Sequence, residues 1–306
     1  MEDPLRLDGA VAVVTGAGNG LGRAEALALA GAGARLVLND LPGDAVHAVA
    51  DEITGAGGEA VVSAGDVGDW AAGAAILKTA LDTYGALNVL VNNAGVLRDR
   101  MIFSMSAEEW DLVMRVHLRG HFVTTRFATA YWRERSKSLG EPVYARIVNT
   151  SSEAFLLGSA GQPNYAAAKA GIVALTVATA RSCARYGVRA NAICPRARTA
   201  MTEGLMGAAP DGDGDPLSPT HVSPLVTYLA SPASARINGE VFVVHGDVAA
   251  VLDPPSIRAS FRAADGSWSV DALHDALGPL FPDDPPGAGF ACEATLPLAA
   301  STFGEP

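Results

Sequence analysis

A tyrosine and a lysine four residues apart, Tyr165 and Lys169, have the types and spacing of a catalytic pair. In a helix, residues at i and i+4 share one face, so the ammonium of Lys169 can lie near the phenol of Tyr165. A nearby cation favours the phenolate and lowers the phenol pKa from its usual value of about 10. Ser152, thirteen residues before Tyr165, follows an apolar strand-like run and could hydrogen-bond a substrate oxygen. With a hydride carrier, these groups could interconvert an alcohol and a ketone near neutral pH.

The N-terminal part of the chain has the pattern of a nucleotide-binding βα unit. The apolar run 11–15 is typical of a buried parallel strand, and an alanine-rich helical stretch runs to about Ala30. Glycines between them can adopt positive φ and bring a helix N-terminus close to a pyrophosphate. We expect this phosphate-binding turn to consist of Gly16, Asn19, Gly20, Leu21 and Gly22. By itself, the motif is also compatible with an ordinary tight turn.

Two further strand ends carry side chains suited to a dinucleotide. Asp40 follows the second apolar run, where a carboxylate binds ribose hydroxyls and repels a 2′-phosphate. Asp40 therefore predicts NAD rather than NADP, and Arg23 is a weaker argument for the opposite choice. Asp66 and Val67 follow the third run and are expected beside the adenine, although Asp66 could also cap a helix.

The fourth apolar run ends in Asn92, Asn93, Ala94 and Gly95. Small residues at this place let the backbone approach a cofactor, and an asparagine amide can bind backbone or ribose groups. We therefore expect Asn93, Ala94 and Gly95 to contact the nucleotide.

Taken together, these motifs resemble the short-chain dehydrogenase/reductase family over about residues 5–247. The matching residues have the family's order and spacing: Thr15, Gly16, Gly20, Gly22, Asn92 to Gly95, Ser152, Tyr165 and Lys169. The resemblance implies a Rossmann-like fold that binds NAD(P) and substrate at the carboxyl ends of its strands.

Residues 92–100 and 110–120 are similar to one branch of this family, the (3R)-hydroxyacyl-CoA dehydrogenases and 17-beta-hydroxysteroid dehydrogenases of the peroxisomal multifunctional type and their actinobacterial relatives. The resemblance implies a 3-hydroxyacyl-CoA or a hydroxysteroid as substrate. His117 stands where most members carry asparagine, and this branch commonly carries histidine. It could link the lysine to solvent through water, or it could merely pack in its helix. By the same resemblance, Pro195 and Thr199 are expected to contact the nicotinamide.

The alternation of apolar strands and alanine-rich helices predicts an α/β fold with a doubly wound, seven-stranded parallel sheet. We expect residues 1–248 to form the NAD-binding Rossmann-like catalytic domain. Residues 249–306 are expected to be a C-terminal extension that packs near the active site or a subunit interface, with one helix-like piece at about 270–280. The 306 residues are 49% hydrophobic, which is sufficient for a sizeable core.

Composition limits the partners. The net charge of −11 disfavours nucleic-acid binding. The acidic start of the chain and the lack of an apolar run of about 18 residues predict neither a signal peptide nor a membrane span. Six histidines form no ligand cluster, so no metal is expected. Three cysteines without paired spacing predict a reduced, cytoplasmic protein.

The expected partners are a small-molecule or CoA-thioester substrate and further copies of the chain, as a homodimer or homotetramer through the apolar helix at 163–186. The basic side chains between residues 98 and 137 could meet the phosphates of coenzyme A, or form a solvated helix face. Residues 199–219 could be a lid or a disordered insertion. Glu153 is expected to be a solvent-facing turn residue.

Two other functions are compatible with the same scaffold. One is an NADPH-dependent 3-oxoacyl-thioester reductase, against which Asp40 argues. The other is a non-catalytic nucleotide-sensing protein, which the simultaneous presence of Ser152, Tyr165 and Lys169 disfavours.

Overall fold

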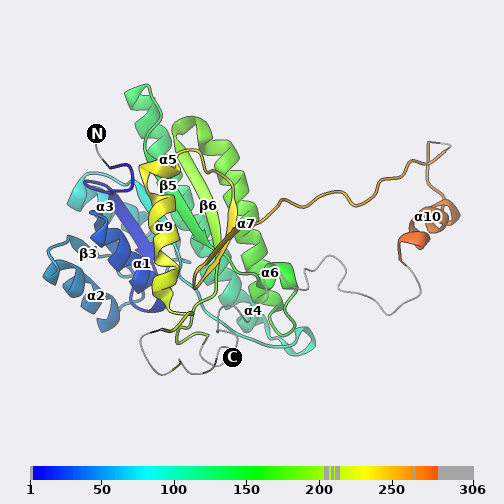
Figure 1. Ribbon diagram of the computed structural model, residues 1–306, viewed down its shortest axis with the longest axis horizontal. Coiled ribbons are helices and arrows are strands. Elements are labelled where there is room, and N and C mark those ends of the chain that lie inside the picture. Colours follow the sequence, from blue (N-terminus) through cyan, green and yellow to red (C-terminus); the bar gives the residue numbers. More distant parts are fainter. Residues whose placement is uncertain (1–2, 203–206, 208–209, 211–213, 265, 282–306) are drawn as a thin grey trace.

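A largely parallel β-sheet with helices on both faces forms the body of the computed structural model (Figure 1). The structure describes residues 3–202, 207, 210, 214–264 and 266–281. The strand order is β3-β2-β1-β4-β5-β6-β7-β8. Successive strands are added on one side of β1 up to β3 and on its other side from β4 onward, so the topological switch point lies between β1 and β4. The strands are β1 Val11–Thr15, β2 Arg35–Asn39, β3 Ala60–Val62, β4 Val89–Asn92, β5 Ala145–Thr150, β6 Val188–Pro195, β7 Val241–His245 and β8 Val248–Val251.

The seven predicted parallel strands are all present, and β8 is an unpredicted eighth strand that runs antiparallel to β7. His245 pairs with Val248, so β7 and β8 are joined by the two residues Gly246 and Asp247. Gly246 adopts a φ of 50°, the positive value that such tight hairpin turns require. A Gly-Asp pair between two apolar runs is a hairpin signal, and it could have identified β8. The predicted domain boundary after residue 248 falls inside this strand.

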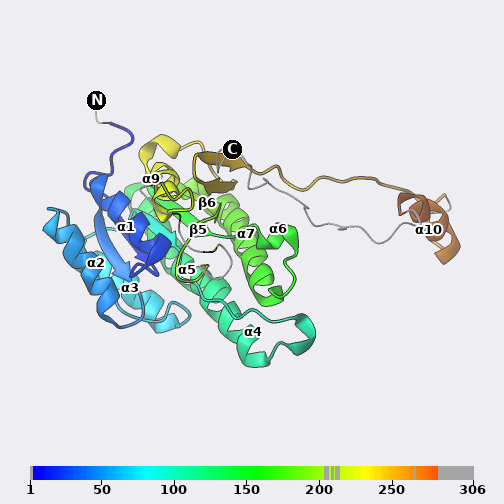
Figure 2. The same ribbon diagram turned by 60° about the horizontal axis from the view of Figure 1, so that its bottom comes forward.

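The helices lie in two layers (Figure 2). One layer holds α1 Gly20–Gly31, α2 Asp44–Gly55 and α9 Ser223–Ala230. The other holds α3 Trp70–Tyr84, α5 Gly120–Leu139 and α7 Pro163–Cys183. The short helices α4 Ala107–Met114 and α6 Ala154–Leu157 pack against α7, beyond the carboxyl ends of the strands.

The sheet has a hydrophobic core on each face. Alternate side chains of each strand pack into one core or the other, because successive residues of a strand point to opposite faces. Ala12 and Val14 of β1 join the cluster that contains Leu29 of α1. Val11 and Val13 join the opposite cluster, which contains Trp132 of α5. All five residues of β1 are buried, as expected for a strand covered on both faces.

After β8 the chain leaves the sheet as an extended segment and reaches α10 Val270–Leu277, which lies away from the body of the protein (Figure 1). The predicted helical piece at 270–280 is therefore present, as α10 and the following 3₁₀ turn Gly278–Leu280. Phe261, Trp268 and Phe281 gather with apolar residues of α10 around a shallow hollow.

Candidate active site

The predicted catalytic side chains converge where α7 begins and β5 ends. Ser152 lies just beyond β5, while Tyr165 and Lys169 lie in the first two turns of α7. Pro163 starts this helix at a position where its missing N–H costs nothing. The ammonium Nζ of Lys169 is 5.3 Å from the centroid of the Tyr165 ring and donates to the carbonyl of Thr150 at 2.6 Å. The spacing argument from the sequence therefore holds in the structure.

Two adjacent serines have different tasks. The hydroxyl of Ser151 is buried and donates to the carbonyl of Lys169 at 2.9 Å, which ties β5 to α7. The hydroxyl of Ser152 accepts from the N–H of Ala154 at 3.2 Å, and Ser152 acts to lower the pKa of the Tyr165 phenol. Of the two serines, Ser152 is the one that acts on the phenol, and its catalytic role stays a prediction.

Burial governs the protonation of this group. It raises the pKa of Tyr165 to about 12, and the hydrogen bond from Ser152 opposes that rise. It also lowers the pKa of Lys169 to about 7. The sequence led us to expect a lowered phenol pKa beside the lysine. The structure gives the opposite direction, because the loss of water around the phenol outweighs the effect of Ser152.

His117 lies in a π-helical segment, Arg115–Arg119, which separates α4 from α5. Nε2 of His117 lies 2.8 Å from the carbonyl oxygen of Val96 and 2.9 Å from its N–H, so the tautomer decides whether it donates or accepts, and Nδ1 has no hydrogen-bond partner. The imidazole meets the Tyr165 ring edge-on, with centroids 5.2 Å apart. Burial, and then the charge of Lys169, hold the pKa of His117 well below its usual value. His117 is therefore a neutral buried imidazole against the catalytic tyrosine, and π-helical insertions often occur at functional sites.

The glycine-rich turn between β1 and α1 has room for a pyrophosphate. Gly16 and Gly20 adopt φ values of 65° and 53°. A Cβ at Gly16 would approach the Cα of Ala94 to 2.8 Å, so only glycine fits there. Asn19 precedes α1 without capping it, and the first turn carries no acidic residue. The N–H groups of this turn and the positive end of the helix are thus suited to an anion, with Leu21 and Gly22 in the same turn.

Asp40 lies against this turn, just after β2. Its carboxylate accepts from the N–H of Gly18 at 2.9 Å and from that of Leu41 at 2.8 Å. Arg23, the possible argument for a 2′-phosphate, forms a bidentate ion pair with Glu52 of α2 at 2.7 and 2.8 Å. The structure therefore places the Asp40 carboxylate against the glycine turn and pairs Arg23 with another acid.

The residues after β4 lock this strand to β1. The amide of Asn93 donates to the carbonyls of Thr15 and Gly16 at 3.2 and 3.3 Å. The backbone N–H groups of Asn93 and Ala94 donate to the hydroxyl of Thr15. A side chain at Gly95 would collide with the imidazole of His117, which explains the glycine there.

Asp66 and Val67 follow β3 on the same side of the sheet. The Asp66 carboxylate accepts from the N–H of Gly68 at 2.8 Å and pairs with Arg115 at 2.7 Å. It does not cap a helix, since Asp69 is the residue that precedes α3. Val67 is buried against Gly120 of α5, where a Cβ would approach its Cγ2 to 2.7 Å.

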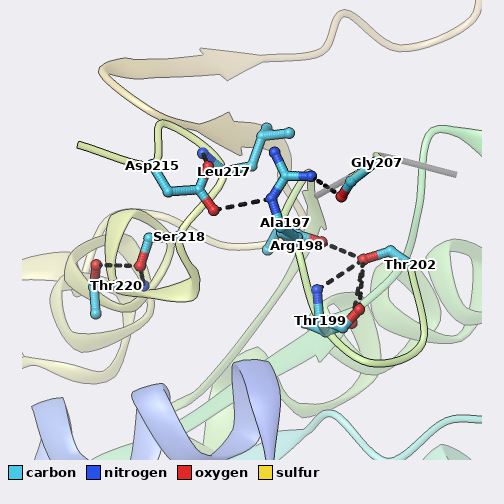
Figure 3. Close-up of polar contacts among 9 residues, drawn as sticks. All are labelled: Ala197, Arg198, Thr199, Thr202, Gly207, Asp215, Leu217, Ser218 and Thr220. Carbon is cyan, nitrogen blue, oxygen red and sulfur yellow. Dashed lines mark hydrogen bonds and ion pairs between the residues drawn. The ribbon is translucent and has the colours of Figure 1, made fainter. Parts of the chain in front are cut away.

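Pro195 ends β6, and Thr199 follows it in a tight cluster of polar contacts (Figure 3). The N–H of Thr199 donates to the hydroxyl of Thr202, and the latter donates to the carbonyl of Ala197 at 2.7 Å. A Cβ at Gly20 would lie 3.0 Å from Cγ2 of Thr199, so this threonine packs on the glycine turn. Thr199 is therefore next to the expected cofactor path.

An ion pair and a backbone hydrogen bond join the residue before Thr199 to the chain at residues 215–217. Arg198 Nε lies 3.0 Å from a carboxylate oxygen of Asp215, and the N–H of Arg198 donates to the carbonyl of Leu217 at 2.7 Å (Figure 3). The lid predicted at 199–219 lies partly outside the described residues, as does much of the acidic loop 211–215.

One residue pair of the site was not anticipated. Glu153 is buried and forms a bidentate ion pair with Arg196, with N–O distances of 2.5 and 2.8 Å. The prediction of a solvent-facing Glu153 is therefore wrong, because the residue turns inward to an arginine beyond the neighbouring strand. The signal available in the sequence was Arg196 itself, which replaces the glycine of the common P-G-x-x-x-T pattern.

The remaining expectations concern side chains away from the site. Several basic residues between 98 and 137 are engaged with acids of the surface: Arg100 with Glu109, and Arg133 and Lys137 with Glu134. Cys183 and Cys194 are free thiols, and Cys292 lies outside the described residues. Within the described part of the chain, no cluster of three or more potential metal ligands occurs. No helix among the described residues has the length and apolarity needed to cross a bilayer.

Comparisons with known proteins agree with this geometry. The short chain dehydrogenase family matches residues 10–207. The chain is 52% identical over 294 residues to the hydroxyacyl-CoA dehydrogenase ChsB1 of Mycobacterium tuberculosis, covering 93% of this chain and 92% of that protein. It is 43% identical over 253 residues to mouse peroxisomal multifunctional enzyme type 2, covering 80% of this chain and 32% of that longer protein.

A solved structure has the same fold. A short chain dehydrogenase from Mycobacterium avium superimposes with a TM-score of 0.83 at 45% identity, covering 92% of this chain and 97% of the other. The glycine turn, the serine after β5 and the tyrosine–lysine pair on α7 thus occur on a shared scaffold. The chain belongs to the short-chain dehydrogenase family.

Proposed function

We propose that this protein oxidises the secondary alcohol of a 3-hydroxyacyl-CoA to the ketone, with NAD as hydride acceptor. The observation that carries the proposal is the convergence of Ser152, Tyr165 and Lys169 beside the glycine turn, at the carboxyl edge of the sheet. Similarity to a hydroxyacyl-CoA dehydrogenase over 93% of the chain supports the acyl-CoA substrate. A fatty acyl chain and a steroid side chain are both within this class, and a free hydroxysteroid is the nearest relative outside it.

Tyr165 would take the proton of the substrate hydroxyl. Ser152, which acts on the pKa of the phenol, would hydrogen-bond the same substrate oxygen and hold it between the two side chains. Bound NAD supplies the acceptor for hydride and a positive charge next to the site. A phenol whose pKa burial raises to about 12 needs such a charge to act as a base near neutral pH.

Lys169 would serve as the next proton carrier. Its pKa of about 7 allows it to exchange protons in the neutral range, and its Nζ is already fixed by the carbonyl of Thr150. His117 would then link this group to solvent through water. The ring contact of His117 with Tyr165 and its free Nδ1 support this role over simple packing.

The choice of NAD rests on Asp40. Its carboxylate is held at the glycine turn by the N–H of Gly18, where it would bind the ribose hydroxyls and repel a 2′-phosphate. The bidentate pair of Arg23 with Glu52 removes the nearest candidate for phosphate binding. We further propose that Asn19, Asn93, Val67, Pro195 and Thr199 contact the cofactor.

We also propose that the protein is a cytoplasmic homodimer or homotetramer. Large apolar side chains are exposed on the surface near α3 to α5, including Trp70, Trp110 and Phe122. The two free thiols of the described chain are consistent with a reducing compartment. The extension after β8, with its apolar cluster around α10, would pack near the active site or the interface of the assembled protein.

Initial rates with a panel of substrates test the proposal. The panel comprises (3R)- and (3S)-hydroxyacyl-CoAs, steroid-side-chain acyl-CoAs and free hydroxysteroids, each with NAD and with NADP. NAD-dependent oxidation of a CoA thioester is the expected result. Turnover of free steroids alone would contradict the CoA assignment, and a strict preference for NADP would favour a biosynthetic reductase.

A further inference from the structure

A buried ion pair joins the residue after the catalytic serine to the neighbouring strand. Nε and Nη2 of Arg196 contact the two carboxylate oxygens of Glu153 at 2.5 and 2.8 Å. Only 8% of the Glu153 side chain and 15% of the Arg196 side chain are exposed. Two parallel contacts fix the relative orientation of both groups, which a single contact does not.

Both ends of the pair are attached to rigid backbone. The N–H of Arg196 donates to the carbonyl of Val244 at 3.0 Å, so this residue continues the ladder between β6 and β7. Glu153 precedes α6, and its carbonyl accepts from the N–H groups of Leu156 and Leu157 at 2.9 and 3.0 Å. The ion pair therefore fastens the start of α6 to the sheet.

Ser152 belongs to the same turn. Its hydroxyl accepts from the N–H of Ala154, and its carbonyl accepts from the N–H of Phe155 at 3.3 Å. These contacts depend on the backbone of Glu153, which lies between the donors and the serine. A displacement of Glu153 would therefore move the hydroxyl of Ser152 relative to Tyr165.

The surroundings make the pair sensitive to the loss of either partner. His245 is buried at the end of β7 with no hydrogen bond on either ring nitrogen, and the charges of Arg196 and Glu153 both act on it. The charges of Glu153 and Lys169 both act on the buried thiol of Cys194, the next-to-last residue of β6. Removing one of its charges breaks a buried ion pair, a change that is typically strongly destabilising.

We propose that the Glu153–Arg196 ion pair positions Ser152, so that its hydroxyl meets both the phenol of Tyr165 and the substrate oxygen. In this role both residues act through the serine. The proposal rests on the role assigned to Ser152 in the proposed function.

Glu153→Gln keeps the size of the side chain and removes its charge. We expect kcat for alcohol oxidation to fall about tenfold to a hundredfold, with little change in the KM for NAD, because small displacements of a positioned group have effects of this order. The Ser152 contact lowers the pKa of Tyr165, so the rise of kcat with pH should move to higher pH in this variant. Glu134→Gln breaks the exposed pair of Glu134 with Arg133 and is the matched control, which should leave the pH profile unshifted.

A double-mutant cycle separates positioning from a general structural role. If Glu153 acts through Ser152, Glu153→Gln should have little further effect on kcat in the Ser152→Ala background. An equal loss in both backgrounds, with an unshifted pH profile, would overturn the proposal. If Glu153→Gln fails to fold, Arg196→Lys keeps the charge but loses the two-pronged contact, and the same cycle with Ser152→Ala applies. Wild-type turnover by Ser152→Ala itself would instead contradict the proposed function.

Discussion

Lys169 holds its ammonium 5.3 Å from the centroid of the Tyr165 ring, one helical turn along α7. In the same position it donates to the carbonyl that ends β5, so the first turns of α7 are fixed against the sheet. The cost of this arrangement is burial, which lowers the pKa of Lys169 to about 7 and raises that of Tyr165 to about 12.

Replacing Lys169 by methionine should reduce kcat by about a hundredfold or more, because the proton carrier is lost.

The free energy of unfolding of Lys169→Met should change in the opposite sense, that is, increase. The folded pKa of Lys169 lies below its unfolded value of 10.5, so the unfolded chain binds more protons between about pH 7 and 10.5. Wild-type stability should therefore rise through this window, and Lys169→Met should remove the rise. Denaturation midpoints at pH 6 and 10 measure it, and equal pH dependence in both proteins would contradict the buried ammonium.

Substitutions of His117 test whether its imidazole is part of a proton path or only packs in the protein interior. His117→Phe keeps a buried ring but has no nitrogen, and we expect kcat to fall about tenfold or more while NADH affinity is retained. His117→Asn, which can still order a water, should keep most of the activity. Steady-state rates of the two variants, with thermal stability as a control, measure the difference. Full activity of His117→Phe would show that the imidazole only fills space.

Asp40→Ala should weaken the preference for NAD. Without the carboxylate, the 2′-phosphate of NADP is no longer repelled, and the ribose hydroxyls lose their acceptor. We expect the ratio of kcat/KM for NADP to that for NAD to rise about tenfold or more. Asp44→Ala, four residues further on in the first turn of α2, is the control and should leave the ratio unchanged. An unaltered ratio in Asp40→Ala would mean that another group selects the cofactor.

Glu25 of α1 is a buried carboxylic acid that the proposed mechanism does not use. It is fully buried, and neither oxygen has a hydrogen-bond partner. Burial raises its pKa from 4.5 to about 8. A folded pKa above the unfolded one stabilises the protein at low pH, and this contribution is lost as pH rises through about 8.

Glu25→Gln should therefore stabilise the protein at pH 9 by on the order of a few kcal/mol, and change little at pH 4. Urea denaturation at the two pH values is the measurement, with the exposed Glu52→Gln as reference. An equal effect at both pH values would show that Glu25 titrates normally.

Local sequence patterns anticipated the parts of the fold and site that depend on spacing. The interval between Tyr165 and Lys169, and the glycines before α1, constrain the chain within one or two turns. The capping of α4 was equally local: Ser106 and Glu109 form the reciprocal hydrogen bonds of a capping box.

Contacts between distant residues were harder to anticipate. Glu153 and Arg196 are 43 positions apart, and only the alignment of β5 beside β6 brings them together. The direction of the Tyr165 pKa depended on burial, which the spacing to Lys169 does not reveal. The strand β8 is short and only partly buried, so apart from the Gly-Asp turn before it, its own sequence carries only a weak pattern.

The most direct test of the central claim is turnover by Tyr165→Phe, compared with wild type in NAD-dependent oxidation of a 3-hydroxyacyl-CoA. The variant lacks only the phenolic oxygen. We predict that kcat falls by at least about a thousandfold, while NADH binding, followed by fluorescence titration, stays within about twofold of wild type. Turnover near the wild-type rate would show that another group moves the proton, and would contradict the role assigned to Tyr165.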